Sequence, residues 1–315
     1  IPFCNTRCVY CSFPGETIKS DLFVDDYLNA LIFELNQVKK ISIKNNLKLR
    51  CVYIGGGTPT SINQFQLNKI ITSFLEIFPE TLNGMEFTVE AGRPDSISIE
   101  KLKVLSKFGV NRISINPQTM LDKTLKIIGR HHTTKQTINA FYLARECSFN
   151  NINMDTIMGL PGEGFEDFKF TMDEIFKLNP EGLTIHSLAI KKGSKLALSD
   201  SALTDGDTIQ RMVDYGDYTA SKLNMSPYYL YRQKYMSGHQ QNIAYSKIGK
   251  ECLYNVDIME ENVNIIAVGA GAISKRIFYD KNKRIERAPN VSNVSIYIDR
   301  ISEMINRKIE LFNNK

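Results

Sequence analysis

Residues 1–11, IPFCNTRCVYC, decide how this chain is interpreted. They place Cys4, Cys8 and Cys11 in the order C-x3-C-x2-C. Three thiolates at this spacing predict a [4Fe-4S] cluster that is held through three irons and has one open iron. An open iron can chelate a small molecule, and S-adenosylmethionine (SAM) is the usual occupant. We therefore expect a catalytic cluster rather than a purely electron-carrying one.

Two other cysteine chemistries fit this stretch less well. A zinc knuckle needs four tetrahedral ligands, and the loop contains no fourth Cys or His. A disulfide framework belongs to small secreted domains with paired cysteines. A chain of 315 residues can bury a core without such cross-links.

Composition predicts a folded protein that mildly favours anionic ligands. The chain is 43% hydrophobic and carries a formal net charge of +5, but it has no dense Lys/Arg tract, so nucleic acid is not expected as a partner. Apolar stretches such as 263–273 are too short to cross a membrane, and residues 1–20 lack a signal peptide's apolar region. We therefore expect no membrane span and a cytoplasmic location, where thiols stay reduced. Because the cysteines follow Ile1 at once, we also expect that an upstream segment has been lost.

Short apolar segments alternate with amphipathic ones over the first two thirds of the chain. Strands are predicted at 51–54, 86–90, 112–116, 151–157 and 183–189, and helices at 21–40, 63–78, 97–108, 134–147 and 166–178. This alternation implies a parallel sheet with right-handed crossovers. With one strand added upstream of the cysteines, the expected fold is α/β, a partial (β/α)6 barrel over residues 1–200.

The remaining residues, 201–315, are predicted to be an appended, mainly helical C-terminal region packed on the barrel. Its predicted elements are helices near 207–223 and 293–312 and a strand-like run at 265–268. The Tyr-rich segment 227–234 has no regular pattern.

Glycine and polar residues follow the predicted strands, where barrel enzymes carry their chemistry. The turn GGGTP at 55–59 lets backbone groups approach a ligand closely. Glu90 ends the next strand and is suited to ribose hydroxyls, while Arg130 offers a rigid fork for a methionine carboxylate. Gln118 and Asp155 occupy similar positions.

Other reactive side chains receive structural interpretations. His131 and His132 are adjacent and cannot share one face of an element, so we expect a polar loop. His186 is either a cavity residue or a hydrogen-bonded core histidine. The remaining cysteines stand singly and are expected to be buried thiols: Cys51, Cys147 and Cys252.

Three stretches together resemble a known family: IPFCNTRCVYC at 1–11, GGGTPT at 55–60 and MGLPGE at 158–163. They are similar to the radical SAM enzymes of the oxygen-independent coproporphyrinogen III oxidase family. The resemblance spans nearly the whole chain. LYRQK at 230–234 and GAGAIS at 269–274 look most like a divergent branch named as coproporphyrinogen dehydrogenases.

The resemblance implies a radical SAM barrel and a set of site residues. Cys4, Cys8 and Cys11 would bind the cluster as metal ligands. The implied cofactor-binding residues are Tyr10, Gly56, Gly57, Thr58, Glu90, Gln118, Arg130 and Asp155, with Ala189 and Ile273 as apolar contacts. Because well-studied members of the family bind two SAM molecules, one or two are expected here.

The resemblance also implies the reaction. An electron donor such as flavodoxin or ferredoxin reduces the cluster, and a 5′-deoxyadenosyl radical takes a hydrogen from a propionate of coproporphyrinogen III. Loss of carbon dioxide and an electron leaves a vinyl group, a step of porphyrin and haem biosynthesis. Arg232 and Lys234, in an aromatic-rich segment, are our hypothetical catalytic-site anchors for the tetrapyrrole propionates. The alternative is a solvated pair beside core tyrosines.

One departure keeps other functions open. Well-studied dehydrogenases of the family have a fourth cysteine two residues after the third, where this chain has Phe13. The chaperone branch of the family also has Phe there, so a haem-binding chaperone is an alternative. A radical methyltransferase or ring-opening enzyme acting on a tetrapyrrole is another.

Overall fold

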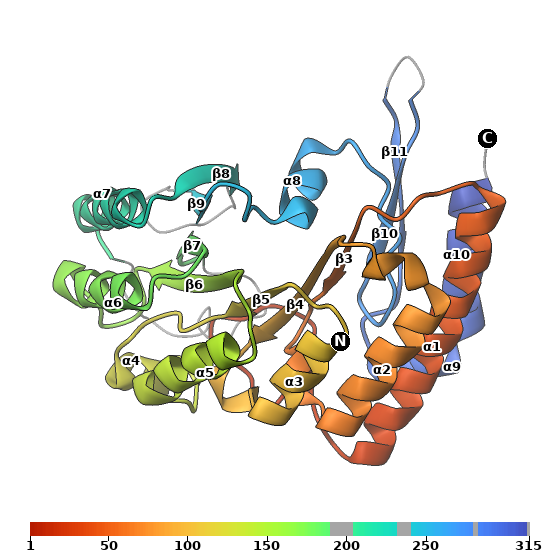
Figure 1. The fold of residues 1–315 in the computed structure, drawn as a ribbon, viewed down its shortest axis with the longest axis horizontal. Helices are drawn as coiled ribbons and strands as arrows, with labels where there is room; N and C mark the ends of the chain where they lie inside the picture. The colour runs from red at the N-terminus through yellow and green to blue at the C-terminus, as the bar shows by residue number, and fades with distance from the viewer. Residues whose placement is uncertain (190–203, 232–240, 280–282, 314–315) are drawn as a thin grey trace.

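A computed structural model describes residues 1–189, 204–231, 241–279 and 283–313 of the chain. The molecule is a mixed α/β protein in which helices surround one curled sheet, as Figure 1 shows. Arg232 and Lys234, our proposed propionate anchors, lie outside the described residues.

The central sheet has seven strands in the order β3-β4-β5-β6-β7-β9-β8. The first five are parallel, as predicted: β3 (Cys51–Ile54), β4 (Glu86–Gly92), β5 (Arg112–Ile115), β6 (Ile152–Met158) and β7 (Gly182–Ser187). The last two, β9 (Asn242–Ser246) and β8 (Ser226–Tyr231), are antiparallel to their neighbours. The α/β partial barrel is therefore confirmed, but the C-terminal region extends its sheet instead of adding helices alone. The domain boundary at residue 200 stays a prediction.

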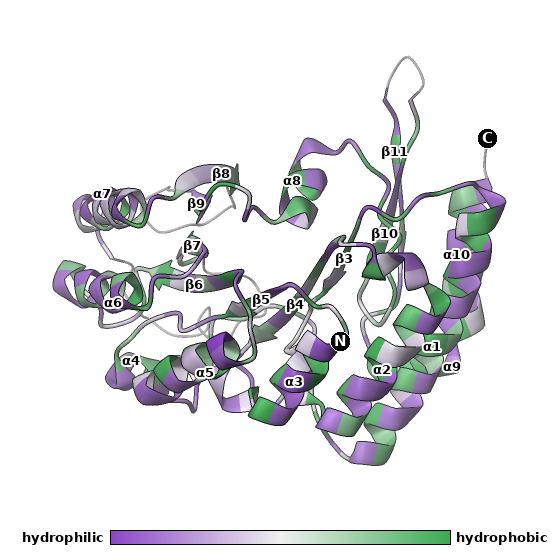
Figure 2. Ribbon diagram, in the orientation of Figure 1, coloured by the Kyte–Doolittle hydropathy of each residue, from purple (hydrophilic) through white to green (hydrophobic). Residues whose placement is uncertain are grey.

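Amphipathic helices cover the outer face of the sheet. In chain order they are α1 (Asp21–Lys44), α2 (Gln64–Ile77), α3 (Ile99–Lys107), α4 (Asp122–Ile127), α5 (Thr134–Glu146), α6 (Phe165–Leu178) and α7 (Gly206–Lys222). Short 3-10 turns span Pro59–Ser61, Pro79–Leu82 and Pro94–Ser96. Figure 2 shows hydrophobic and hydrophilic residues alternating around the helices. The predicted N-cap of the first helix is confirmed, since Phe23 N–H donates to Ser20 Oγ at 3.2 Å.

The end of the chain differs from the prediction in two places. In the predicted strand at 265–268, only Ile265 makes a bridge, to Lys275; the regular strands are β10 (Ile273–Ile277) and β11 (Ile285–Pro289), an antiparallel pair. The predicted helix at 293–312 is broken into α9 (Val294–Asp299) and α10 (Ile301–Asn313), because the backbone at Arg300 leaves the helical conformation. α8 (Leu253–Glu260) packs against β3 and β8.

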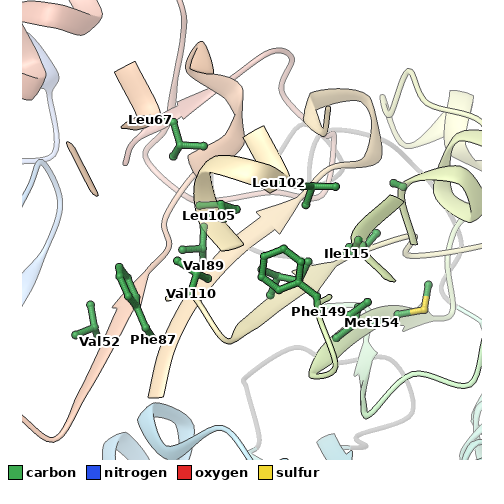
Figure 3. Packing of buried hydrophobic residues seen from close by; sticks show 14 of the residues in the cluster. Val52, Leu67, Phe87, Val89, Leu102, Leu105, Val110, Ile115, Phe149 and Met154 are labelled. Atoms are coloured by element: carbon green, nitrogen blue, oxygen red, sulfur yellow. The ribbon is translucent and has the colours of Figure 1, made fainter. Parts of the chain in front are cut away.

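The two faces of the sheet have opposite chemistry. Ile113 and Ile115 of β5 are fully buried in the main hydrophobic core, together with Val89 of β4 and Met154 of β6. Figure 3 shows Val89, Ile115 and Met154 in the same cluster as Leu102 and Leu105 of α3. Because side chains alternate along a strand, the residues between them point to the concave side of the sheet. That side is polar, and the candidate site lies at its carboxyl-terminal edge.

Candidate cofactor site

A cavity of about 410 Å³ lies where the cysteine loop meets the carboxyl ends of β3, β4 and β5. Every site residue predicted between Cys4 and Arg130 lines it: Cys4, Cys8, Tyr10, Cys11, Gly56, Gly57, Thr58, Glu90, Gln118 and Arg130. Residues from distant parts of the sequence therefore meet at one place. Their proximity does not test their roles, which remain proposals.

The cysteine loop rests on the glycine turn through backbone contacts. Gly57 N–H donates to Ile1 O at 2.9 Å, and Thr58 N–H donates to Phe3 O at 2.7 Å. A β-carbon at Gly57 would lie 2.5 Å from Phe3 O, which is closer than any side chain tolerates. Glycine is therefore required at position 57 so that the strand that carries Cys4 can pack against the turn.

The cysteine thiols are partly exposed and unpaired, as metal-binding thiols must be. Burial raises the pKa of the Cys4 thiol; a contact of 3.6 Å with Thr58 Oγ1 opposes this, and nearby Cys11 and Cys8 add to it. Among the described residues, no three Cys, His, Asp or Glu side chains are grouped tightly enough to hold a single metal ion. A [4Fe-4S] cluster takes each thiolate on a different iron, so its ligands are spread apart. Three soft thiols around one open cavity fit such a cluster.

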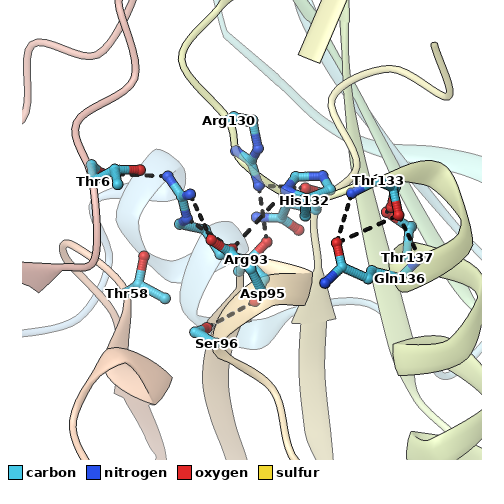
Figure 4. A network of polar contacts seen from close by, with 12 residues as sticks. Thr6, Thr58, Arg93, Asp95, Ser96, Arg130, His132, Thr133, Gln136 and Thr137 are labelled. Carbon is cyan, nitrogen blue, oxygen red and sulfur yellow. Dashed lines mark hydrogen bonds and ion pairs between the residues drawn. The ribbon is translucent and has the colours of Figure 1, made fainter. Parts of the chain in front are cut away.

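Arg93 is a cavity residue that the sequence analysis missed. Its guanidinium donates to both Asp95 oxygens, at 3.0 and 2.8 Å, and to Thr6 O at 3.3 Å and Cys8 Sγ at 3.5 Å. Figure 4 shows it between Thr6 and Asp95. Asp95 thus holds a positive charge beside the cysteine loop. No motif surrounds Arg93 in the sequence, so only the fold reveals it.

Arg130 braces the same loop from the other side. It donates to Tyr10 OH at 3.1 Å and to Asn116 O at 2.6 Å, and its buried Nε has no partner in the described part of the chain. His131 and His132 lie in a loop, as expected, but only His131 is exposed. His132 is buried, and burial, assisted by the charge of Arg130, lowers its pKa to about 3.

Glu90 is held by two donors at the edge of the cavity. Tyr53 OH donates to Glu90 Oε1, and Gly56 N–H donates to Oε2 at 3.2 Å. Burial raises the pKa of this carboxyl, and the bond from Tyr53 opposes the rise. The carboxylate is thereby oriented toward the cavity that it lines.

Gln118 and Asn116 present unsatisfied polar atoms at the cavity. Gln118 Oε1 and Asn116 Oδ1 are buried and lack a hydrogen-bond partner among the described residues. Gln118 also has φ of 69°, in the left-handed region that non-glycine residues rarely adopt. Unsatisfied polar groups and backbone strain at one cavity are typical of a site that binds a polar ligand.

The other predicted cofactor residues do not line this cavity. Asp155 lies deeper on β6, where it accepts from Asn153 Nδ2 at 2.6 Å and lies 3.8 Å from His186 Nε2. Burial opposes its ionisation, but these partners hold the pKa of Asp155 below its usual value. Ala189 follows β7, and Ile273 begins β10 with its side chain exposed. Cys147 and Cys252 are buried as expected, whereas Cys51 is half-buried.

A family model described as the radical SAM superfamily matches residues 1–175. The chain belongs to that superfamily. Within it, the chain is 40% identical to the oxygen-independent coproporphyrinogen-III oxidase-like protein HemZ of Bacillus subtilis over 98% of its own length and 62% of the relative. The predicted resemblance is thereby confirmed: this radical SAM chain has homologues among the oxygen-independent coproporphyrinogen III oxidases and oxidase-like proteins.

Other relatives of this radical SAM chain have a different description. It is 39% identical to the heme chaperone HemW of Bacillus subtilis over 61% of its length and 49% of the relative. The coproporphyrinogen III oxidase HemN from Escherichia coli matches 97% of this chain and 68% of that chain with a TM-score of 0.74 and 20% identity, which shows the fold. The chain spans 62% of the HemZ relative and 49% of the HemW relative.

Radical SAM proteins use a [4Fe-4S] cluster and SAM, and these are the cofactors of this chain. In the residues that the structure describes, no helix is long and apolar enough to cross a membrane.

Proposed function

We propose that this chain catalyses the oxygen-independent decarboxylation of coproporphyrinogen III propionates to vinyl groups, a step of porphyrin and haem biosynthesis. The observation that carries the proposal is the 40% identity to a coproporphyrinogen oxidase-like protein over 98% of the chain. The HemW protein of Bacillus subtilis is 39% identical over 61% of the chain, and HemW proteins that cover more of it, such as that of Escherichia coli over 89%, are only 25% identical. A cavity that joins the three cysteines to carboxylate and amide side chains supports the same reaction class.

In this proposal, Cys4, Cys8 and Cys11 hold the cluster, while Arg93 and Thr58 contact two of the thiols. When bound, the cluster and SAM supply a carbon radical that abstracts hydrogen. The positive charge of Arg93 favours the thiolate form of Cys4 by electrostatic attraction, although burial of Cys4 raises its pKa overall.

The polar residues of the cavity would position SAM. Glu90 would accept hydrogen bonds from the ribose hydroxyls, since both of its oxygens are already oriented. Gln118 Oε1 and Arg130 Nε have unused hydrogen-bonding capacity at the same cavity. Asp155, Ala189 and Ile273 would serve a second SAM or the substrate, because they lie outside this cavity.

Each turnover removes one hydrogen atom and one further electron from a propionate side chain. Carbon dioxide leaves with breakage of the carbon–carboxylate bond, and the remaining carbons form the vinyl double bond. The abstracted hydrogen ends in 5′-deoxyadenosine, an electron donor such as flavodoxin or ferredoxin reduces the cluster, and a one-electron acceptor takes the last electron. Since the chemistry needs reduced thiols, we also propose a cytoplasmic location.

A haem chaperone is the second candidate, and one residue favours it. Phe13 stands where the well-studied dehydrogenases have a fourth cysteine, and its ring lines the cavity close to Gly56. HemW proteins are also among the relatives. A radical methyltransferase or ring-opening enzyme acting on a tetrapyrrole is a further alternative that shares the same cofactors.

The test is anaerobic reconstitution of the protein with iron and sulfide, followed by SAM, reductant and coproporphyrinogen III. We expect 5′-deoxyadenosine together with products lighter by one carbon dioxide and two hydrogens per propionic acid side chain, measured by mass spectrometry. 5′-Deoxyadenosine without decarboxylated product would refute the substrate and retain the radical chemistry. Haem binding without either product would support the chaperone.

A further inference from the structure

The concave face of the central sheet carries a buried arginine that has no hydrogen-bond or ion-pair partner among the described residues. Arg112 begins β5 and is 3% exposed. Its Nε is buried without a hydrogen-bond partner, and no hydrogen bond or ion pair from its guanidinium reaches any residue of the described chain. A buried charge in this state costs several kcal/mol unless something compensates it.

Strand register places this side chain on the polar face. Arg112 pairs with Thr88, and Ser114 pairs with Glu90 and Asn153. Register partners in a parallel sheet point to the same side, so these residues share the concave face with Glu90, which lines the cofactor cavity. Ser114 Oγ is a second buried polar atom without a partner among the described residues.

The acidic side chain whose charge favours that of Arg112, Glu86, is already hydrogen-bonded elsewhere. Glu86, at the start of β4, accepts from Leu253 N–H at 2.7 Å and from Tyr254 N–H at 3.4 Å. It therefore caps the N-terminus of α8, where a carboxylate is stabilised by the free backbone N–H groups. No hydrogen bond or ion pair joins Glu86 to Arg112 among the described contacts, so the N–H groups of the arginine are left for another acceptor.

Tyrosine rings flank the arginine. Tyr53 stacks on Tyr254 with ring centroids 4.3 Å apart, and Tyr228 and Tyr229 lie 5.8 Å apart on β8. Tyr228 and Tyr53 are close enough to Arg112 to influence its charge. Aromatic faces beside one free guanidinium suit a flat ligand that bears carboxylates.

We propose that Arg112 binds a carboxylate of the substrate on this concave face. The identity of that substrate as a tetrapyrrole rests on the proposed function. Arg112 lies two residues, about 7 Å of strand, below the level of Glu90. A macrocycle with several propionates can span that distance, so one propionate reaches the cofactor cavity while another binds Arg112. The arginine thereby sets which side chain is presented for reaction.

The experiment measures binding of coproporphyrin III, the oxidised form of the proposed substrate, and of its tetramethyl ester, to the reconstituted protein. Wild-type protein should prefer the acid. In Arg112→Gln, the affinity for the acid should fall at least about tenfold while that for the ester is unchanged, because a charged hydrogen bond is lost. Arg112→Lys keeps the charge but loses the planar guanidinium with its paired donors, so its affinity for the acid should lie between those of wild type and Arg112→Gln.

Arg50→Gln is the matched control, because Arg50 directly precedes β3, two strands from β5 in the sheet, and already pairs with Asp257 at 2.8 Å. It should leave both affinities unchanged. Arg112→Gln should have a melting temperature no lower than that of wild type, since it removes an unpaired buried charge. A lower melting temperature, together with equal losses of affinity for the acid and the ester, would show a structural role and overturn the inference.

The outcomes separate this inference from the proposed reaction. Unchanged acid binding in Arg112→Gln overturns the anchor and leaves the reaction standing. If Arg112→Gln loses the preference for the acid over the ester, and wild-type protein does not decarboxylate coproporphyrinogen III, the anchor is supported and the reaction is refuted. If wild-type protein binds neither porphyrin, the anchor is overturned, and the reaction is judged by decarboxylation alone.

Discussion

Lys308→Met should destabilise the protein severely, because it isolates a buried carboxylate. Lys308 on α10 and Glu34 on α1 are 1% and 0% exposed and lie 2.7 Å apart. Burial lowers the pKa of Lys308, and the charge of Glu34 opposes that shift. Glu34 also accepts from Gly269 N–H, Asn290 Nδ2 and Tyr297 OH at 2.8, 2.9 and 2.6 Å. The pair thus ties the first helix to the last segments of the chain.

The magnitude follows from the contacts that disappear. Lys308 Nζ donates to Glu34 Oε1 at 2.7 Å and to Asn290 Oδ1 at 2.6 Å. Charged hydrogen bonds contribute about 1.5–3 kcal/mol each, and breaking one partner of a buried pair costs about 3–5 kcal/mol. Methionine has a similar volume, so no large cavity adds to the cost. We therefore expect a loss of about 3–5 kcal/mol in the free energy of unfolding.

Urea unfolding followed by far-UV circular dichroism measures this loss as a shift in midpoint at constant slope. Lys39→Met is the surface control, since Lys39 pairs with Glu80 at 29% and 40% exposure and should lose at most about 1 kcal/mol. Adding Glu34→Gln to Lys308→Met should recover part of the loss, because the neutral amide keeps an acceptor without a buried charge. The reasoning is refuted if Lys308→Met loses no more than the control, or if the double variant recovers nothing.

Three further predictions concern the cofactor site. The pKa of His132 is about 3 in the folded protein and about 6.5 in the unfolded chain, so between these pH values only the unfolded chain binds the extra proton and stability falls as the pH falls. His132→Asn should therefore reduce the slope of the unfolding free energy against pH, near pH 4–5, by about 1.4 kcal/mol per pH unit. Equal slopes in the variant and the wild type would contradict this. Gly57→Ala should reduce iron bound per chain after reconstitution, because its β-carbon would meet Phe3 O, whereas Gly164→Ala, with open space around it, should not. Glu90→Gln should weaken SAM binding by about tenfold in equilibrium dialysis with iron content unchanged; equal losses of both would point to a folding defect.

The alternating part of the fold could be predicted from the sequence because the apolar residues of each strand and helix there follow a regular spacing. The cysteine loop, the glycine turn and the strand ends could be assigned for the same reason. β8 was missed because the register shifts between Pro227 and Tyr229, which breaks the period-two pattern that identifies a strand. Arg93 was missed since its role depends on Asp95 and Cys8, which only the folded chain brings beside it.

The polar concave face was visible in the sequence but was not interpreted. Arg112, Ile113, Ser114 and Ile115 alternate polar and apolar, although a strand buried on both faces should be apolar throughout. In a filled barrel the interior is a packed core of branched aliphatic residues. A parallel strand that turns arginine and serine inward therefore indicates an interior built to hold a polar ligand. The outward isoleucines pack against the helices as part of the core, so folding stability comes from one face of the sheet, and the other face is free for the ligand binding that we propose.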